Sequence, residues 1–122
     1  MLSLALAGLT LALVYTEIAR LFRGFKAIKP ADLTQLINAG NAVLVDLSAP
    51  ADFEKGHIAG SRNVQAKQFG PTHKLVVNAK QQPVVLVDST GMASTSAAKA
   101  LKKAGFEQIH VLDGGLPAWS AQ

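Results

Sequence analysis

The 122-residue chain contains no cysteine. A thiolate nucleophile, a persulfide carrier, a zinc–thiolate site and an iron–sulfur cluster all need cysteine, so this chain alone can form none of them. A scaffold stabilised by disulfides is excluded for the same reason. Whatever chemistry the chain performs must therefore use other side chains.

Charged and aromatic residues are also scarce, at 16% and 6% of the chain, whereas 49% of the residues are hydrophobic. This balance and the length favour one globular domain over a disordered or fibrous chain. The formal net charge of +4 would suit nucleic acid, but the folded part lacks the clustered cations interleaved with aromatics that a nucleic-acid face needs. We therefore expect no nucleic-acid partner.

The first 16 residues carry no charge, and then Arg20, Arg23, Lys26 and Lys29 follow against Glu17 alone. A helix of this length spans about 24 Å, and extension through residue 22 brings it to the hydrocarbon core of about 30 Å. We expect a transmembrane anchor at 1–22 and a basic juxtamembrane linker at 23–29. Because cations mark the cytoplasmic side, the folded domain is expected in the cytoplasm as part of a single-pass protein.

Two other interpretations of the apolar run are weaker. A buried core helix would have a polar face, and this run is apolar all round. A secretory signal would have cations before the run, and here they follow it. If the run were cleaved, the product would be an exported soluble domain. We expect an anchored protein. A short anchor with the folded domain on the cytoplasmic side would suit a bacterial inner membrane, which is the location that we expect.

Beyond the linker, residues 30–122 alternate between helical patterns and short apolar runs. Helices are expected at 32–39, 48–55, 94–104 and 116–121, and strands at 42–47, 83–87 and 109–112. The strands are almost uninterrupted apolar runs, as strands buried on both faces should be. The pattern predicts an α/β fold, a doubly wound parallel sheet with helices on both faces.

Ligands of such a sheet bind beyond the carboxyl ends of its strands, which directs attention to the loops at 46–60 and 88–94. The second loop reads Asp-Ser-Thr-Gly-Met-Ala-Ser and leads straight into a helix. A glycine among small hydroxyl residues at a helix N-terminus can turn several backbone N–H groups inward, which makes a cradle for an anion. Many purely structural turns share this spacing.

Two further stretches resemble the signatures of rhodanese-like domains. Val-Asp-Leu at 45–47, followed by Gly-His-Ile-Ala-Gly-Ser-Arg-Asn at 56–63, is similar to the first signature, and Leu-Asp-Gly-Gly-Leu-Pro-Ala-Trp at 112–119 is similar to the last. The resemblance covers about residues 29–121 and implies the rhodanese-like fold. The residues that match the family pattern are Asp46, Gly56, His57, Gly60, Asn63, Gly114, Gly115 and Trp119.

The resemblance fails at the catalytic loop. The family's Cys-x-x-Gly-x-Arg-Ser aligns with residues 88–94, which places Asp88 at the cysteine and Ala93 at the arginine. Ser48 likewise stands where the family has an arginine after the first aspartate. A carboxylate cannot carry a transferable sulfur, so the resemblance implies the fold and argues against the activity. No catalytic residue is expected in this degenerate loop. The residues expected to contribute to binding are Asp88, Ser89, Thr90, Gly91, Met92 and Ser94.

The acidic residues and histidines are expected to be structural. Asp88 should accept hydrogen bonds from the N–H groups of residues 89–91, and Asp46 should hold the loop around His57. A phosphoryl-accepting aspartate would need further carboxylates and Mg²⁺, for which the loop offers only hydroxyls. His57, His73 and His110 lack metal-ligand spacing, so no metal and no cofactor are expected.

The sequence thus predicts a membrane-anchored rhodanese-like pseudoenzyme. It would act as a protein-binding or adaptor module at the cytoplasmic face, with an unidentified membrane or cytosolic protein as partner. Met92, with its flexible apolar tip, is the residue that we expect such a partner to contact. The alternative is a sulfurtransferase-related or anion-binding protein that uses a partner's thiol.

Overall fold

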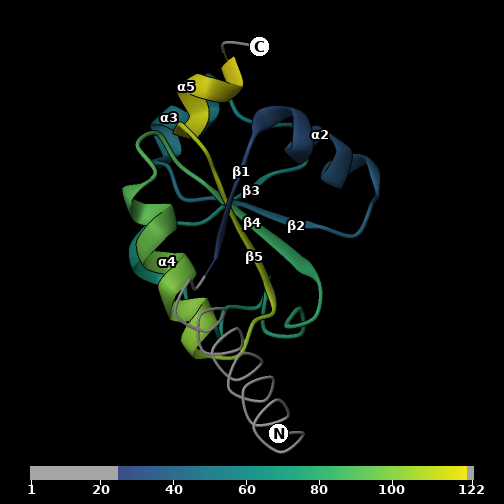
Figure 1. Cartoon of the computed structure of the whole chain (residues 1–122). Coiled ribbons are helices and arrows are strands. Elements are labelled where there is room, and N and C mark those ends of the chain that lie inside the picture. Colours follow the sequence, from purple (N-terminus) through teal and green to yellow (C-terminus); the bar gives the residue numbers. More distant parts are fainter. Residues whose placement is uncertain (1–24, 121–122) are drawn as a thin grey trace, which may run out of the picture.

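The computed structural model describes residues 25–120, which form a five-stranded sheet flanked by helices (Figure 1). All neighbouring strands are parallel, in the order β1-β5-β4-β2-β3. The strands are β1 (Lys26–Ile28), β2 (Val43–Asp46), β3 (Arg62–Asn63), β4 (Pro83–Val87) and β5 (Gln108–Leu112). The predicted α/β fold with a parallel sheet is therefore confirmed.

Helices connect the strands and cover both faces of the sheet. They are α2 (Pro30–Asn38), α3 (Pro50–Lys55), α4 (Met92–Lys103) and α5 (Gly115–Ser120), with a 3-10 turn at Ala66–Gln68. Figure 1 shows α4 on the left side of the sheet and α2 on the right. Such two-sided covering explains why the central strands read as solid apolar runs.

The central strand β4 divides its side chains between two hydrophobic cores. Val84 and Leu86 pack with Ala98 and Leu101 of α4, whereas Val85 and Val87 pack on the opposite face. The second core also contains Leu33 of α2, Ile58, and the partly buried Leu116 and Trp119 of α5. Alternation along a strand thus supplies apolar side chains to both layers at once.

The element boundaries differ from the sequence prediction in ways that local chemistry explains. Helix α2 begins at Pro30 rather than residue 32, because proline fits the first turn of a helix, where its missing N–H has no partner to lose. Helix α3 begins at Pro50 rather than residue 48, with Ala49 at its N-cap, and no side chain caps it. Helix α4 begins two residues earlier than predicted, at Met92.

Strand β1 lies within the segment that the sequence analysis assigns to the basic linker. Residues 26–28 pair with His110–Leu112 of β5, so these three residues are part of the sheet. The predicted anchor at 1–22 lies outside the described residues. Within residues 25–120, no helix has the length and apolar character needed to cross a membrane.

Candidate functional site

The loop between β4 and α4 lies at the carboxyl edge of the sheet and consists of residues 88–91. Gly91 is the N-cap residue of α4 and has a φ of +87°, a left-handed conformation that L side chains rarely adopt. Its backbone oxygen accepts the first helical hydrogen bond, from the N–H of Thr95 at 2.9 Å. The loop therefore turns directly from the sheet into the helix, as the glycine predicts.

Asp88 is buried, with 6% of its surface exposed. Its Oδ1 accepts hydrogen bonds from the hydroxyl of Ser94 at 2.6 Å and from the backbone N–H of Ser94 at 3.3 Å. Its Oδ2 accepts a weaker bond from the hydroxyl of Thr90 at 3.4 Å. The expected donors, the N–H groups of residues 89–91, are thus replaced by Ser94, because the turn at Gly91 brings the first turn of α4 over the carboxylate.

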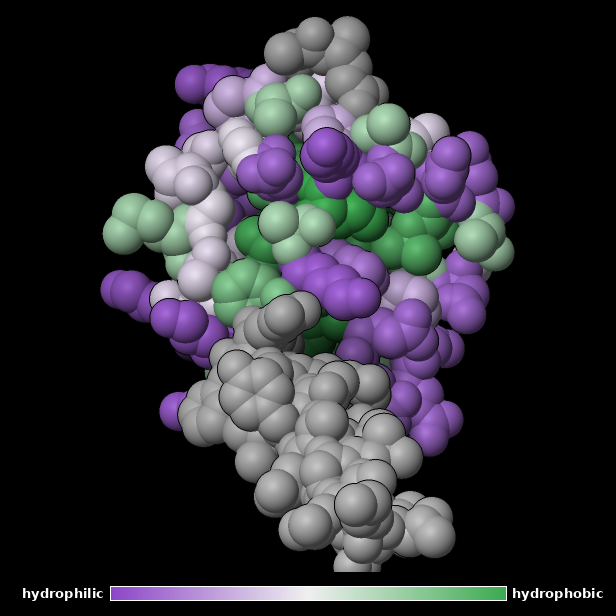
Figure 2. Space-filling view, viewed as in Figure 1, coloured by the Kyte–Doolittle hydropathy of each residue, from purple (hydrophilic) through white to green (hydrophobic). Residues whose placement is uncertain are grey.

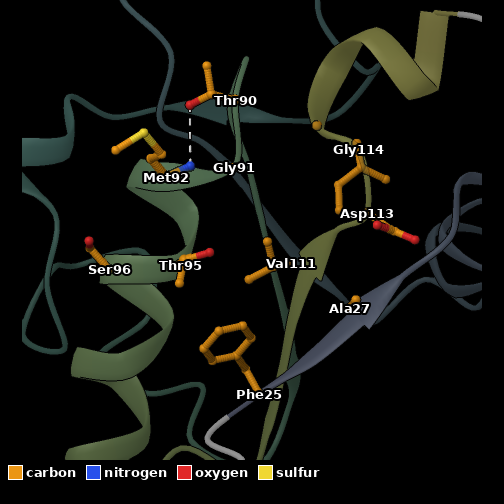
Figure 3. A pocket seen from close by; sticks show the side chains of 12 residues that line it. Phe25, Ala27, Thr90, Gly91, Met92, Thr95, Ser96, Val111, Asp113 and Gly114 are labelled. Atoms are coloured by element: carbon orange, nitrogen blue, oxygen red, sulfur yellow. Dashed lines mark hydrogen bonds between the residues drawn. The ribbon is translucent and has the colours of Figure 1, made fainter.

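Thr90 and Met92 form the outer side of this loop. The Thr90 hydroxyl accepts a hydrogen bond from the Met92 N–H at 3.3 Å, which satisfies one free donor at the start of α4 (Figure 3). The Met92 side chain is 77% exposed. Ser89 is exposed as well, Ala93 is half-buried and Ser94 is fully buried. The loop therefore buries the Asp88 carboxylate and the Ser94 hydroxyl and turns the apolar side chain of Met92 outward.

The last signature of the sequence packs directly against this loop. The N–H of Leu116 donates to the backbone oxygen of Asp88 at 3.1 Å. Gly115 approaches so closely that a Cβ there would lie 2.7 Å from the Ser89 oxygen and 2.9 Å from the Asp88 oxygen. At Gly114 a Cβ would lie 2.7 Å from the Cβ of Ala118. The paired glycines thus let the start of α5 support the degenerate loop.

A cavity of about 530 Å³ opens beside the loop, between α4 and strands β1 and β5. Figure 3 shows Phe25, Thr95 and Val111 directed into it, with Thr90 at one end and Asp113 on the far wall. On the face drawn in Figure 2, hydrophobic surface is visible among hydrophilic side chains. Sequence analysis missed this wall, because Phe25 belongs to the segment interpreted as a linker and nothing local indicates that β1 joins β5.

The carboxylates of Asp46 and Asp88 do not form a pair. Asp46 lies opposite Val87 in the sheet register, and side chains along a strand alternate between faces. Asp88 contacts Ser94 on the α4 side, so the two side chains belong to opposite faces. The geometry of the strands therefore holds the two carboxylates apart at this sheet edge.

Asp46 organises the first signature, but it does so without His57. Its Oδ1 accepts the Ser48 N–H at 2.8 Å, and its Oδ2 and the Ser48 hydroxyl are buried without a hydrogen-bond partner. The amide of Asn63 donates to the backbone oxygens of Asp46 and Ser48 at 3.0 and 2.9 Å. Asn63 is thus the residue that ties the loop to the strand, which corrects the role expected for Asp46.

His57 is exposed and bound within its own segment. Its Nδ1 lies 2.7 Å from the backbone oxygen of Phe53, and its ring stacks on the Phe53 ring with centroids 3.7 Å apart. Gly60, with a φ of +87°, makes the turn that follows. Trp119 is half-buried in the core beside α2. Gly56 ends α3 in extended backbone. These contacts stabilise the fold and present no reactive group.

The fold changes the titration of His110. Burial lowers the pKa of its imidazole, and the positive charge of Lys26, its partner in the register between β1 and β5, lowers it further. Within residues 25–120, no three histidine or acidic side chains are grouped in a way that could hold a metal ion. His73 lies in the turn-rich segment that follows the 3-10 helix, near strand β3 at the other edge of the sheet.

The comparisons with known proteins agree with the sequence motifs. Residues 29–122 match the family model described as Rhodanese-like domain. The chain is 40% identical to the uncharacterized protein YibN of Escherichia coli strain K12, over 99% of this chain and 85% of that protein. It is 33% identical to the thiosulfate sulfurtransferase GlpE of Pseudoalteromonas translucida, over 80% of this chain and 90% of that protein.

Solved structures agree on the fold. A rhodanese-related protein from Thermoplasma volcanium superposes with a TM-score of 0.65 at 23% identity, over 80% of this chain and 92% of that one. The human single-domain sulfurtransferase TSTD1 gives 0.66 at 18% identity, over 79% and 96%. At these identities the superpositions show the fold alone. The family model and the relatives at 40% and 33% identity show the family to which the chain belongs. The chain belongs to the rhodanese-like domain family and lacks that family's cysteine.

Proposed function

We propose that this chain is a rhodanese-like pseudoenzyme that works as a protein-binding or adaptor module and has no intrinsic sulfurtransferase activity. The observation that carries the proposal is the buried carboxylate of Asp88 at the position of the family's cysteine, in a chain without any cysteine. Sulfur transfer in this family needs a thiolate there, and a carboxylate forms no persulfide.

The contacts of Asp88 also oppose substrate binding. The N–H and hydroxyl of Ser94 already donate to its Oδ1, so these donors at the start of α4 are not free for an anion. An incoming thiosulfate would meet a carboxylate in a buried setting, where like charges repel strongly. The site therefore disfavours the substrate as well as the reaction.

The surface around Met92 supports a binding role. Met92 combines 77% exposure with a flexible thioether chain, and it borders the cavity of about 530 Å³. The walls contributed by Phe25 and Val111 are apolar, and Thr95 adds a hydroxyl. An exposed apolar side chain next to an apolar hollow is the arrangement that a partner's side chain can fill.

We further propose that the chain is held at a membrane by residues 1–22, with the folded domain on the cytoplasmic side of a bacterial inner membrane. The apolar run and the cations that follow it support this proposal. The similarity to YibN covers 99% of the chain and so includes the apolar run.

Photo-crosslinking from Met92 tests the binding role. A benzophenone amino acid is placed at position 92 of the full chain in native membranes, and in a second sample at Lys103, an exposed residue at the far end of α4. We expect a discrete crosslinked protein from position 92. The same protein should be absent among the crosslinks from position 103. The same crosslinking pattern from both positions would refute recognition through this loop.

The second candidate function is a sulfurtransferase-related or anion-binding protein that receives a thiol from a partner. The relatives named thiosulfate sulfurtransferase favour it. Calorimetric titration of the full chain with thiosulfate and sulfite at neutral pH separates the two candidates. We expect no measurable heat of binding, and saturable binding at the loop would favour the second candidate instead.

A further inference from the structure

A second cavity, of about 410 Å³, lies at the edge of the sheet opposite to Met92. Strand β3 supplies Arg62 and Asn63 to its lining, and the segment that leads toward β4 supplies Gln68, His73 and Lys74. No residue of the degenerate loop lines it. Its properties are therefore independent of the loop chemistry described above.

The charge of this cavity has one sign. Arg62 and Lys74 are both exposed, and no aspartate or glutamate is among the lining residues. A guanidinium offers a planar fork of donors that matches phosphate oxygens, and an ammonium adds a compact point charge. Two cations without a lining carboxylate create a concave site that attracts a doubly charged anion.

His73 adds a ring donor. Its Nδ1 accepts a hydrogen bond from the Leu75 N–H at 3.2 Å, which leaves its Nε2–H to donate. Gln68 adds a side-chain amide to the same lining. The cavity thus combines two charged donors with neutral ones, which is how phosphate groups are held in proteins.

Both walls of the cavity are fixed by hydrogen bonds. On one wall, Asn63 donates to the backbone oxygens of Asp46 and Ser48 at 3.0 and 2.9 Å. On the other, the backbone oxygen of His73 accepts the N–H of Val76 at 3.0 Å, and Val76 is fully buried in the core. A site whose backbone is already ordered loses less entropy when a ligand binds.

From this arrangement we infer that the cavity binds a small organic anion that carries a phosphate group. Its volume lies in the range of about 300–1,000 Å³ that small-molecule sites occupy, so it has room for more than the phosphate itself. The cations neutralise the phosphate dianion, and the amide of Gln68 and the imidazole of His73 hold its oxygens. This site goes beyond the proposed recognition loop and does not depend on it.

Amide chemical shifts of the full chain in detergent micelles test the inference. The probes are ribose 5-phosphate, ribose and acetate, each titrated at constant ionic strength. We expect saturable shifts at Asn63, Val64 and Lys74 with ribose 5-phosphate only. Shifts that do not saturate, shifts of equal size with ribose or acetate, or shifts confined to residues 88–94 would overturn the inference.

Charge-neutralising variants complete the test. Arg62→Gln and Lys74→Gln should each weaken the binding of ribose 5-phosphate about tenfold, as expected for the loss of a charge-assisted hydrogen bond. Lys80→Gln is the matched control, because Lys80 is an exposed lysine of the same segment that does not line the cavity. It should change the affinity less than about twofold. An equal loss in Lys80→Gln and Lys74→Gln would mean non-specific attraction and would overturn the inference.

Discussion

Replacing Gly115 by alanine should destabilise the protein more than an alanine at any glycine in open space. A Cβ at Gly115 would lie 2.7 and 2.9 Å from the backbone oxygens of Ser89 and Asp88, so the loop or α5 would have to move. The residue also has a φ of +67°, which costs a non-glycine residue about 1–2 kcal/mol. Overpacking of this kind adds about 1–3 kcal/mol. The total loss is about 2–5 kcal/mol.

Gly40→Ala is the matched control for this prediction. Gly40 has a φ of +87°, and nothing lies within 4 Å of the Cβ that would be added. The loss of stability in Gly40→Ala should therefore come from the backbone conformation alone, about 1–2 kcal/mol. The difference between the two variants isolates the steric contact between Gly115 and the loop.

Urea unfolding of the full chain in micelles measures both losses, with fluorescence of the single tryptophan, Trp119, as the signal. Trp119 lies on α5 beside the contact and is half-buried in the folded state. With a slope of about 1–3 kcal/mol per molar urea, the expected losses shift the midpoint measurably. Equal losses in Gly115→Ala and Gly40→Ala would refute the reasoning, because the close approach would then have no energetic consequence.

Asp88→Ala should cost about 1–3 kcal/mol, because it leaves the N–H and hydroxyl of Ser94 buried without an acceptor, whereas Asp88→Asn keeps an acceptor and should cost less in the same urea assay. The double variant Asp88→Cys, Ala93→Arg should gain thiosulfate sulfurtransferase activity that neither single variant has; a folded but inactive double variant would show that the loop backbone has diverged from that of its active relatives. Because the pKa of His110 in the folded state lies below its ordinary value of about 6.5, the unfolded chain takes up the proton first as the pH falls. The contribution of His110 to stability is therefore retained above about pH 6.5 and decreases as the pH falls toward the folded-state pKa. Thermal unfolding across this range should show that His110→Gln loses less stability on acidification than the unchanged protein. Lys26→Gln, which removes the neighbouring positive charge, should also reduce this acid-induced loss of stability.

Much of the fold could be predicted from the sequence because its central elements carry strong local signals. Strand β4 is an unbroken apolar run between a proline and an aspartate, and the structure places it at Pro83–Val87, as predicted. Gly105, which follows the predicted helix, has a φ of +95° just beyond the end of α4. These signals act over a few residues and need no knowledge of the partner elements.

Strand β1 shows what local signals miss. Its three residues include an exposed lysine and follow a basic stretch, so the segment reads as a linker. Only the pairing with β5, more than 80 residues away in the chain, makes it a strand. The same long-range contact places Phe25 in the cavity wall, which is why that residue was missed as well.

The candidate site was predicted in position but not in its contacts. The alignment of motifs placed Asp88 at the sheet edge, and the structure agrees. The partner of its carboxylate depends on how the turn at Gly91 orients α4, which spacing alone does not specify. The role of Gly115 depends likewise on a through-space approach between residues more than 20 positions apart.

The two strands at the borders of the sheet are also its shortest, with three residues in β1 and two in β3. A border strand has unpaired backbone groups, to which a strand of another molecule can add, and long apolar borders are where many proteins begin to aggregate. Here each border offers few such groups, and Lys26 places a charge on one of them. Copies of this domain crowded together should therefore remain separate molecules instead of joining their sheets.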